Sequence, residues 1–124
     1  MSYLVLGLIL LTITLSAFAQ LVLKLGVAKP SMANALESGV VDAMLTAMMS
    51  PLILIGLTMY GVAAAMWLWV LSKVDLSVAY PFVGVSFLIT MGFGAFILNE
   101  NVTFIRIVGT ILIAGGCVLV GHSA

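Results

Sequence analysis

Four long apolar stretches separated by short polar segments dominate the chain. They cover about residues 3–27, 51–72, 77–98 and 103–121. A helix rises about 1.5 Å per residue, so stretches of this length can cross a hydrocarbon core of about 30 Å. The pattern predicts an all-α integral membrane protein with four transmembrane helices, organised as a single domain over residues 1–124.

The segment between the first two stretches has a different pattern. Across residues 31–49, apolar residues recur at helical spacing, whereas Asn34, Glu37, Ser38 and Asp42 lie largely on other faces. This segment is too polar to span a membrane, and it predicts one short amphipathic helix lying in the interface. Its polar face is acidic, so we do not expect attraction to anionic lipids to hold it there.

The first stretch carries polar side chains at every fourth position: Thr12, Ser16, Gln20 and Lys24. Residues four apart share one face of a helix, and polar groups at membrane depth mark binding sites or pathways by default. Lys24, near a membrane boundary, could bind an anionic headgroup or could simply anchor the helix end. Ser16 and Gln20 could hydrogen-bond a headgroup or bridge neighbouring helices.

The third stretch contains Tyr80 and Pro81 about one turn from its start, followed by Gly84. Proline removes a backbone donor and can kink a helix, so Pro81 and Gly84 are candidates for a hinge or cavity wall. Tyr80 is a candidate substrate contact, with interfacial anchoring as the alternative. Glu100, in the next turn, is a further candidate substrate contact. It could instead face Lys24 or Arg106, or stabilise the start of the last helix.

The last stretch has a flank of small and branched residues. Gly109, Leu112, Ile113 and Gly116 fall on one side, because seven residues make nearly two helical turns. Small residues let transmembrane helices approach closely. We therefore predict that this flank is a dimer contact.

Composition narrows the function further. The chain is 65% hydrophobic and 6% charged, whereas soluble domains carry about 25% charged residues. Four basic residues balance four acidic ones, which argues against nucleic-acid binding. One cysteine and one histidine provide neither a disulfide nor a metal site, and no nucleophile–base pair is evident. The sequence thus predicts a membrane protein without cofactors or metals, and it offers no catalytic site.

The distribution of basic residues gives an expectation for topology. Lys73 and the two chain ends would share one side of the membrane, while Lys29 and Arg106, with Lys24 nearby, would share the other. Cytoplasmic loops carry an excess of lysine and arginine. The bias favours both termini outside, and insertion in either direction stays open.

Several motifs resemble the four-helix branch of the drug/metabolite transporter superfamily, which includes EamA-like and small multidrug resistance proteins. The block WLWVLSKVDLSVAYP, residues 67–81, resembles the W-x-x-x-L-x-x-x-P-x-x-x-A-Y-P pattern of the aminoarabinose-phosphoundecaprenol flippase subunits, with Asp75 in place of the loop proline. Gln20 and Lys24 match the Q-x-x-x-K of those subunits. Residues 98–103 are similar to the acidic turn of EamA-type transporters, and residues 109–116 to the dimer-forming last helix of small multidrug resistance proteins.

This resemblance implies a transporter that flips a polyprenyl-phosphate-linked sugar, or a similar anionic lipid, between leaflets of a bacterial-type cytoplasmic membrane. Four helices rarely enclose a path alone, so we expect a homodimer or a heterodimer with a related small subunit. Small multidrug exporters carry a titratable glutamate in the first span, two turns before a lysine, where this chain has Ser16. A divergent multidrug-type exporter of cationic or amphiphilic solutes and a non-transporting accessory subunit remain the alternatives.

Overall fold

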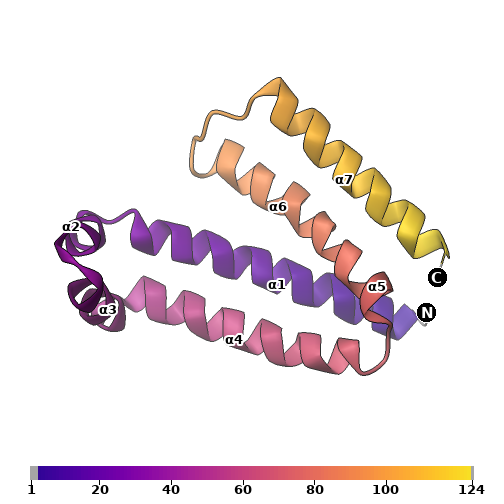
Figure 1. Cartoon of the computed structure of the whole chain (residues 1–124), viewed down its shortest axis with the longest axis horizontal. Coiled ribbons are helices and arrows are strands. Elements are labelled where there is room, and N and C mark those ends of the chain that lie inside the picture. Colours follow the sequence, from indigo (N-terminus) through magenta and orange to yellow (C-terminus); the bar gives the residue numbers. More distant parts are fainter. Residues whose placement is uncertain (1–2, 124) are drawn as a thin grey trace.

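The computed structural model describes residues 3–123, and most of that range is helical (Figure 1). Within it, four helical stretches are long and apolar enough to span a membrane: Tyr3–Val27, Pro51–Leu71, Leu76–Phe96 and Phe104–Ser123. No strand occurs among these described residues. The predicted fold class, an all-α multi-pass membrane protein, is confirmed.

Two of the spanning helices, Pro51–Leu71 and Phe104–Ser123, begin at residues that cap them. Helix α1 is Tyr3–Val27, and α4 is Pro51–Leu71. Ser50 caps α4 by accepting a hydrogen bond from the Ile53 N–H at 3.5 Å, and Pro51 occupies the first turn, where no N–H is needed. Helix α7 is Phe104–Ser123, and the Thr103 hydroxyl accepts a hydrogen bond from the Arg106 N–H at 3.3 Å.

The third span is divided at its proline. It consists of α5 (Leu76–Ala79), the 3-10 turn η1 (Tyr80–Phe82) and α6 (Val83–Phe96). Pro81 has no N–H to donate, so the chain tightens into a 3-10 turn before the α-helix resumes. At its other end the span stops at Phe96, two residues before the predicted boundary at residue 98.

The interfacial segment differs from the single helix predicted over residues 31–49. It forms two short helices, α2 (Pro30–Ser38) and α3 (Val40–Met49), which Gly39 separates. Gly39 has a φ of 138°, a conformation that side-chain-bearing residues rarely adopt. Apolar residues keep helical spacing on both sides of Gly39, so the sequence pattern suggested one continuous helix.

The helices pack as a tight pair and a splayed pair. Helices α1 and α4 lie side by side, and α6 packs on both α1 and α7. Gly26 and Gly56 allow the first contact, since a Cβ on either would lie within 2.8 Å of Ile53 or Leu23. Figure 1 shows α6 and α7 diverging from α1 toward the end that carries α2 and α3. The start of α1 and the end of α7 lie at the opposite end.

Candidate functional site

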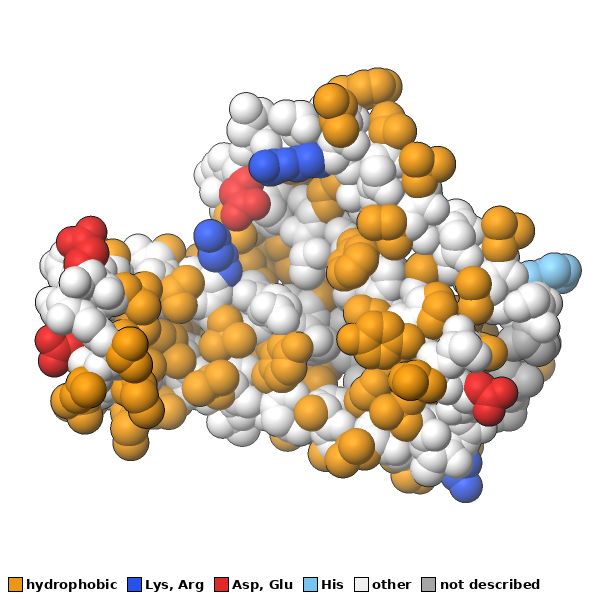
Figure 2. Space-filling model, in the orientation of Figure 1, with side chains coloured by type: hydrophobic (Ala, Val, Ile, Leu, Met, Phe, Trp, Pro, Cys, Tyr) orange, Lys and Arg blue, Asp and Glu red, His pale blue; other side chains and the backbone are white. Residues whose placement is uncertain are grey.

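A cleft of about 860 Å³ lies between α1, α6 and α7. Four of the five predicted substrate contacts line it: Ser16, Gln20, Lys24 and Glu100. Its other polar side chains are Tyr60, Ser86, Thr90, Arg106 and Thr110. Figure 2 shows basic and acidic side chains gathered around the hollow between α1 and the α6–α7 pair. The cleft therefore combines charged and polar side chains with a largely apolar lining.

The wall from α1 uses three of the four regularly spaced polar residues. Ser16 is half-buried, whereas Gln20 and Lys24 are exposed to the cleft. Thr12 does not reach the cleft, because it is buried and its hydroxyl donates to the Leu8 carbonyl at 2.7 Å. The polar face therefore becomes more accessible toward the Lys24 end of the helix.

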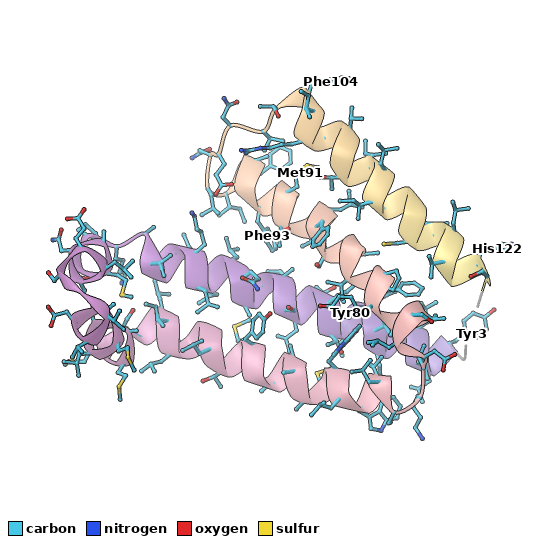
Figure 3. All side chains as sticks on the ribbon, viewed as in Figure 1. Tyr3, Tyr80, Met91, Phe93, Phe104 and His122 are labelled. Atoms are coloured by element: carbon cyan, nitrogen blue, oxygen red, sulfur yellow. The ribbon has the colours of Figure 1, made fainter. Side chains whose placement is uncertain are left out.

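The wall from α6 combines hydroxyl groups with an aromatic ring. Ser86 and Thr90 donate their hydroxyl hydrogens to carbonyl groups of the preceding turn, so their oxygens face the cleft chiefly as acceptors. The ring of Phe93 lies 5.0 Å from that of Phe18 at an angle of 56°. Figure 3 shows Phe93 directed from α6 toward α1, so this aromatic contact joins the two walls.

The turn after α6 holds Glu100 at the cleft. Asn99 adopts a φ of 53°, and the Glu100 N–H donates to the Gly94 carbonyl at 2.7 Å. A Cβ at Gly94 would stand 2.8 Å from the Glu100 carboxylate oxygen, so only glycine leaves the space that this side chain uses. Sequence reasoning missed Gly94, because the contact depends on how the turn folds back over α6.

Arg106 is a second residue that sequence reasoning did not assign to the site. It lines the cleft from the first turn of α7, and its Nη1 donates to the Asn101 carbonyl at 3.2 Å. No ion pair joins Glu100 to Lys24 or Arg106 in the described part of the chain. A basic residue opening the last span, on the same membrane side as Lys24, was the signal that could have found it.

Tyr80, Pro81 and Gly84 do not line this cleft. Tyr80 and Pro81 line a separate shallow pocket with Leu76 and Ser77. Figure 3 shows Tyr80 toward the end of the molecule that carries Tyr3 and His122, opposite to the end approached by Phe93. Gly84 is buried against α7. The structure therefore does not bring Tyr80 together with Lys24, and Gly84 serves helix packing rather than the cleft wall.

The predicted dimer flank on α7 is divided between two environments. Gly109 and Ile113 line the cleft, whereas Leu112 is 71% exposed and Gly116 is also exposed. The flank thus borders the cleft, and no residue from 3 to 123 covers Leu112. Its role as a dimer contact stays a prediction.

Comparison with known proteins supports the resemblance seen in the motifs. No family model matches the chain, and no solved structure matches it. The chain is 36% identical over 70 residues to a protein of Enterobacter sp. (strain 638), with 56% of this chain and 65% of that protein covered. That protein is named as the probable 4-amino-4-deoxy-L-arabinose-phosphoundecaprenol flippase subunit ArnE. The chain resembles a lipid-linked sugar flippase subunit.

Proteins with the same name from two pseudomonads give similar matches. The chain is 32% identical over 75 residues to the Pseudomonas fluorescens (strain Pf0-1) protein, with 60% of this chain and 66% of the relative covered. It is 32% identical over 75 residues to the Pseudomonas aeruginosa (strain UCBPP-PA14) protein, with 60% and 65% covered. The matches span just under two thirds of each flippase subunit, and these relatives are named as transporter subunits rather than enzymes.

Proposed function

We propose that this chain is a four-span transporter domain that moves a polyprenyl-phosphate-linked sugar, or a similar anionic lipid, between membrane leaflets. The observation that carries the proposal is the cleft in which Ser16, Gln20, Lys24 and Glu100 meet. These residues come from α1 and from the turn before α7, so only the folded chain assembles them. The proposed substrate class comes from the similarity of the chain to flippase subunits.

The chemistry of the cleft suits such a headgroup. Lysine binds phosphate as a compact positive charge, and the amide of Gln20 and the hydroxyl of Ser16 can hydrogen-bond a sugar. The name of the relatives specifies an amino sugar, and the carboxylate of Glu100 is a suitable partner for its ammonium group. Apolar side chains surround the cleft on the outside of the bundle, so the polyprenyl tail can stay in lipid.

A partner subunit is part of the proposal. Helices α1, α6 and α7 of this chain line the cleft, while Leu112 and Gly116 on α7 remain uncovered. A second copy, or a related small subunit, packed on this flank would enclose the headgroup path. Lys24, Lys29 and Arg106 are near the α2–α3 end, which we place at the cytoplasmic face of a bacterial inner membrane.

Binding of the carrier lipid tests the proposal without requiring a partner. The purified chain in detergent micelles is mixed with 4-amino-4-deoxy-L-arabinose-phosphoundecaprenol and phosphatidylethanolamine, and retained lipid is measured by native mass spectrometry. We expect preferential retention of the carrier lipid and its loss in Lys24→Ala. Equal retention of the two lipids, or unchanged selectivity in Lys24→Ala, would count against the proposed function.

A further inference from the structure

We propose that Arg106 is the second anion-binding residue of the cleft, and that it holds one phosphate group together with Lys24. This inference rests on the proposed function and adds a specificity-determining residue to the same site. Lys24 comes from the last turns of α1, and Arg106 from the first turn of α7, so the two cations face one cleft from different helices.

Among the residues that the structure describes, the Arg106 guanidinium makes one hydrogen bond to the chain and leaves its other N–H groups available. Its backbone N–H is bound by Thr103, and its Nη1 donates to the Asn101 carbonyl at 3.2 Å. Its remaining N–H groups have no protein partner among residues 3–123. A guanidinium presents its donors as a planar fork that matches phosphate oxygens. One anchored N–H orients this fork and leaves the others for a ligand.

The protein itself does not neutralise this pair of cations. Glu100 is the acidic residue that lines the cleft, and it makes no ion pair with Lys24 or Arg106 within the described range. Its position depends on the turn and on the space above Gly94. Charged groups near the hydrocarbon region are unfavourable unless they are paired or hydrated. An anion bound in the cleft would supply a counter-charge to Lys24 and Arg106, both of which are exposed there.

A phosphate held by both cations would connect α1 to α7 across the cleft. Helices α1 and α7 each pack on α6, so α6 connects the helix that carries Lys24 to the helix that carries Arg106. The alternative is that Lys24 and Arg106 each contact separate lipid headgroups at the membrane surface. In that case the cations would act independently, and loss of one would not change the contribution of the other.

Two cations that hold one phosphate can be recognised by paired substitutions. Binding to the chain in detergent micelles is measured by native mass spectrometry with three probes: undecaprenyl phosphate, undecaprenol and inorganic phosphate. The variants are Lys24→Gln, Arg106→Gln, the double variant and Arg106→Lys. Lys29→Gln is the matched control, because Lys29 is an exposed lysine in the same part of the chain that does not line the cleft.

The expected result is specific to the phosphate. Arg106→Gln and Lys24→Gln should each weaken undecaprenyl phosphate binding about tenfold or more, since charge-assisted hydrogen bonds contribute strongly. The fold loss of affinity in the double variant should be smaller than the product of the two single-variant losses. Arg106→Lys should bind undecaprenyl phosphate more tightly than Arg106→Gln does. Binding of undecaprenol should be unchanged throughout, and Lys29→Gln should bind all probes as the wild type does.

The other outcomes separate this inference from the proposed function. If Lys24→Gln loses undecaprenyl phosphate and Arg106→Gln does not, or if the two effects simply multiply, the shared site is wrong and the proposed function stands. If inorganic phosphate binds in an Arg106-dependent way and the lipid does not, the anion site stands and lipid flipping is wrong. If the wild type binds neither phosphate probe, both proposals are wrong.

Discussion

The carboxylate of Glu100 lies directly over Gly94, where a Cβ would stand only 2.8 Å from its oxygen. This relationship joins the end of α6 to the turn before α7 and places an acidic group in the lining of the cleft. The fold tolerates it because residue 94 has no side chain. A methyl group added at residue 94 would therefore displace the Glu100 carboxylate.

We expect Gly94→Ala to displace Glu100 without unfolding the protein. The atom in the way is the far end of a flexible side chain, and alanine in a helix is favoured over glycine by about 0.5–1 kcal/mol. The displaced carboxylate should bind an ammonium less well. The measurement is the ratio of affinities for 4-amino-4-deoxy-L-arabinose-phosphoundecaprenol and undecaprenyl phosphate, which should fall severalfold.

Gly92→Ala is the matched control for this substitution. Gly92 lies on the same helix, and a Cβ there meets no atom within 4 Å. The affinity ratio of this variant should equal that of the wild type. If Gly94→Ala also leaves the ratio unchanged, Glu100 does not recognise the amino group.

The contact between α1 and α4 should be sensitive to Gly56→Ala. A Cβ at residue 56 would stand 2.8 Å from the Leu23 side chain and 3.2 Å from its backbone nitrogen. The side chain can turn away but the backbone nitrogen cannot, so the helices must separate. Overpacking of this kind costs about 1–3 kcal/mol. The free energy of unfolding in detergent should fall by about that amount.

Gly61→Ala provides the comparison on the same helix. No atom lies within 4 Å of a Cβ at residue 61, so this substitution should leave stability unchanged or raise it by up to about 1 kcal/mol. An equal loss of stability in the two variants would indicate a general effect of alanine in α4. The close approach of α1 and α4 would then not explain it.

Part of this site follows from the sequence, and part does not. The four-residue spacing of Ser16, Gln20 and Lys24 determines a common helix face, so their meeting in the cleft could be predicted. The same spacing wrongly suggested an equivalent environment for Thr12, which packing buries. Periodicity identifies which residues share one face of a helix. It does not say which of these residues a neighbouring helix buries.

The contributions of Gly94 and Arg106 depend on contacts that no local pattern encodes. Gly94 matters because the turn after α6 folds back, and Arg106 because the start of α7 borders the same cleft as α1 and α6. Tyr80 shows the converse case. Its motif resembles that of the flippase subunits, yet the structure places it in a different pocket from Lys24.

The contact between α6 and α7 should protect Cys117 from modification. Cys117 is 4% exposed, its thiol donates to the Pro81 carbonyl, and a Cβ at Gly84 would stand 2.5 Å from its sulfur. We expect slow reaction of the folded chain with N-ethylmaleimide. Gly84→Ala should accelerate the reaction severalfold, because the added methyl group forces the helices apart. Gly92→Ala on the same helix should react at the wild-type rate, and fast labelling of the wild type would contradict the packing described.

The uncovered flank of α7 should cross-link to a partner in the membrane. In a Cys117→Ser background, Leu112→Cys places a thiol on the predicted dimer flank, and Ile111→Cys places one about 100° around the helix. Leu112 and Ile111 are 71% and 57% exposed, so both positions are accessible within this chain. With copper phenanthroline as oxidant in native membranes, a disulfide-linked dimer should form at residue 112 and not at residue 111. Comparable yields would mean random collision, and this flank would then face lipid rather than a second subunit.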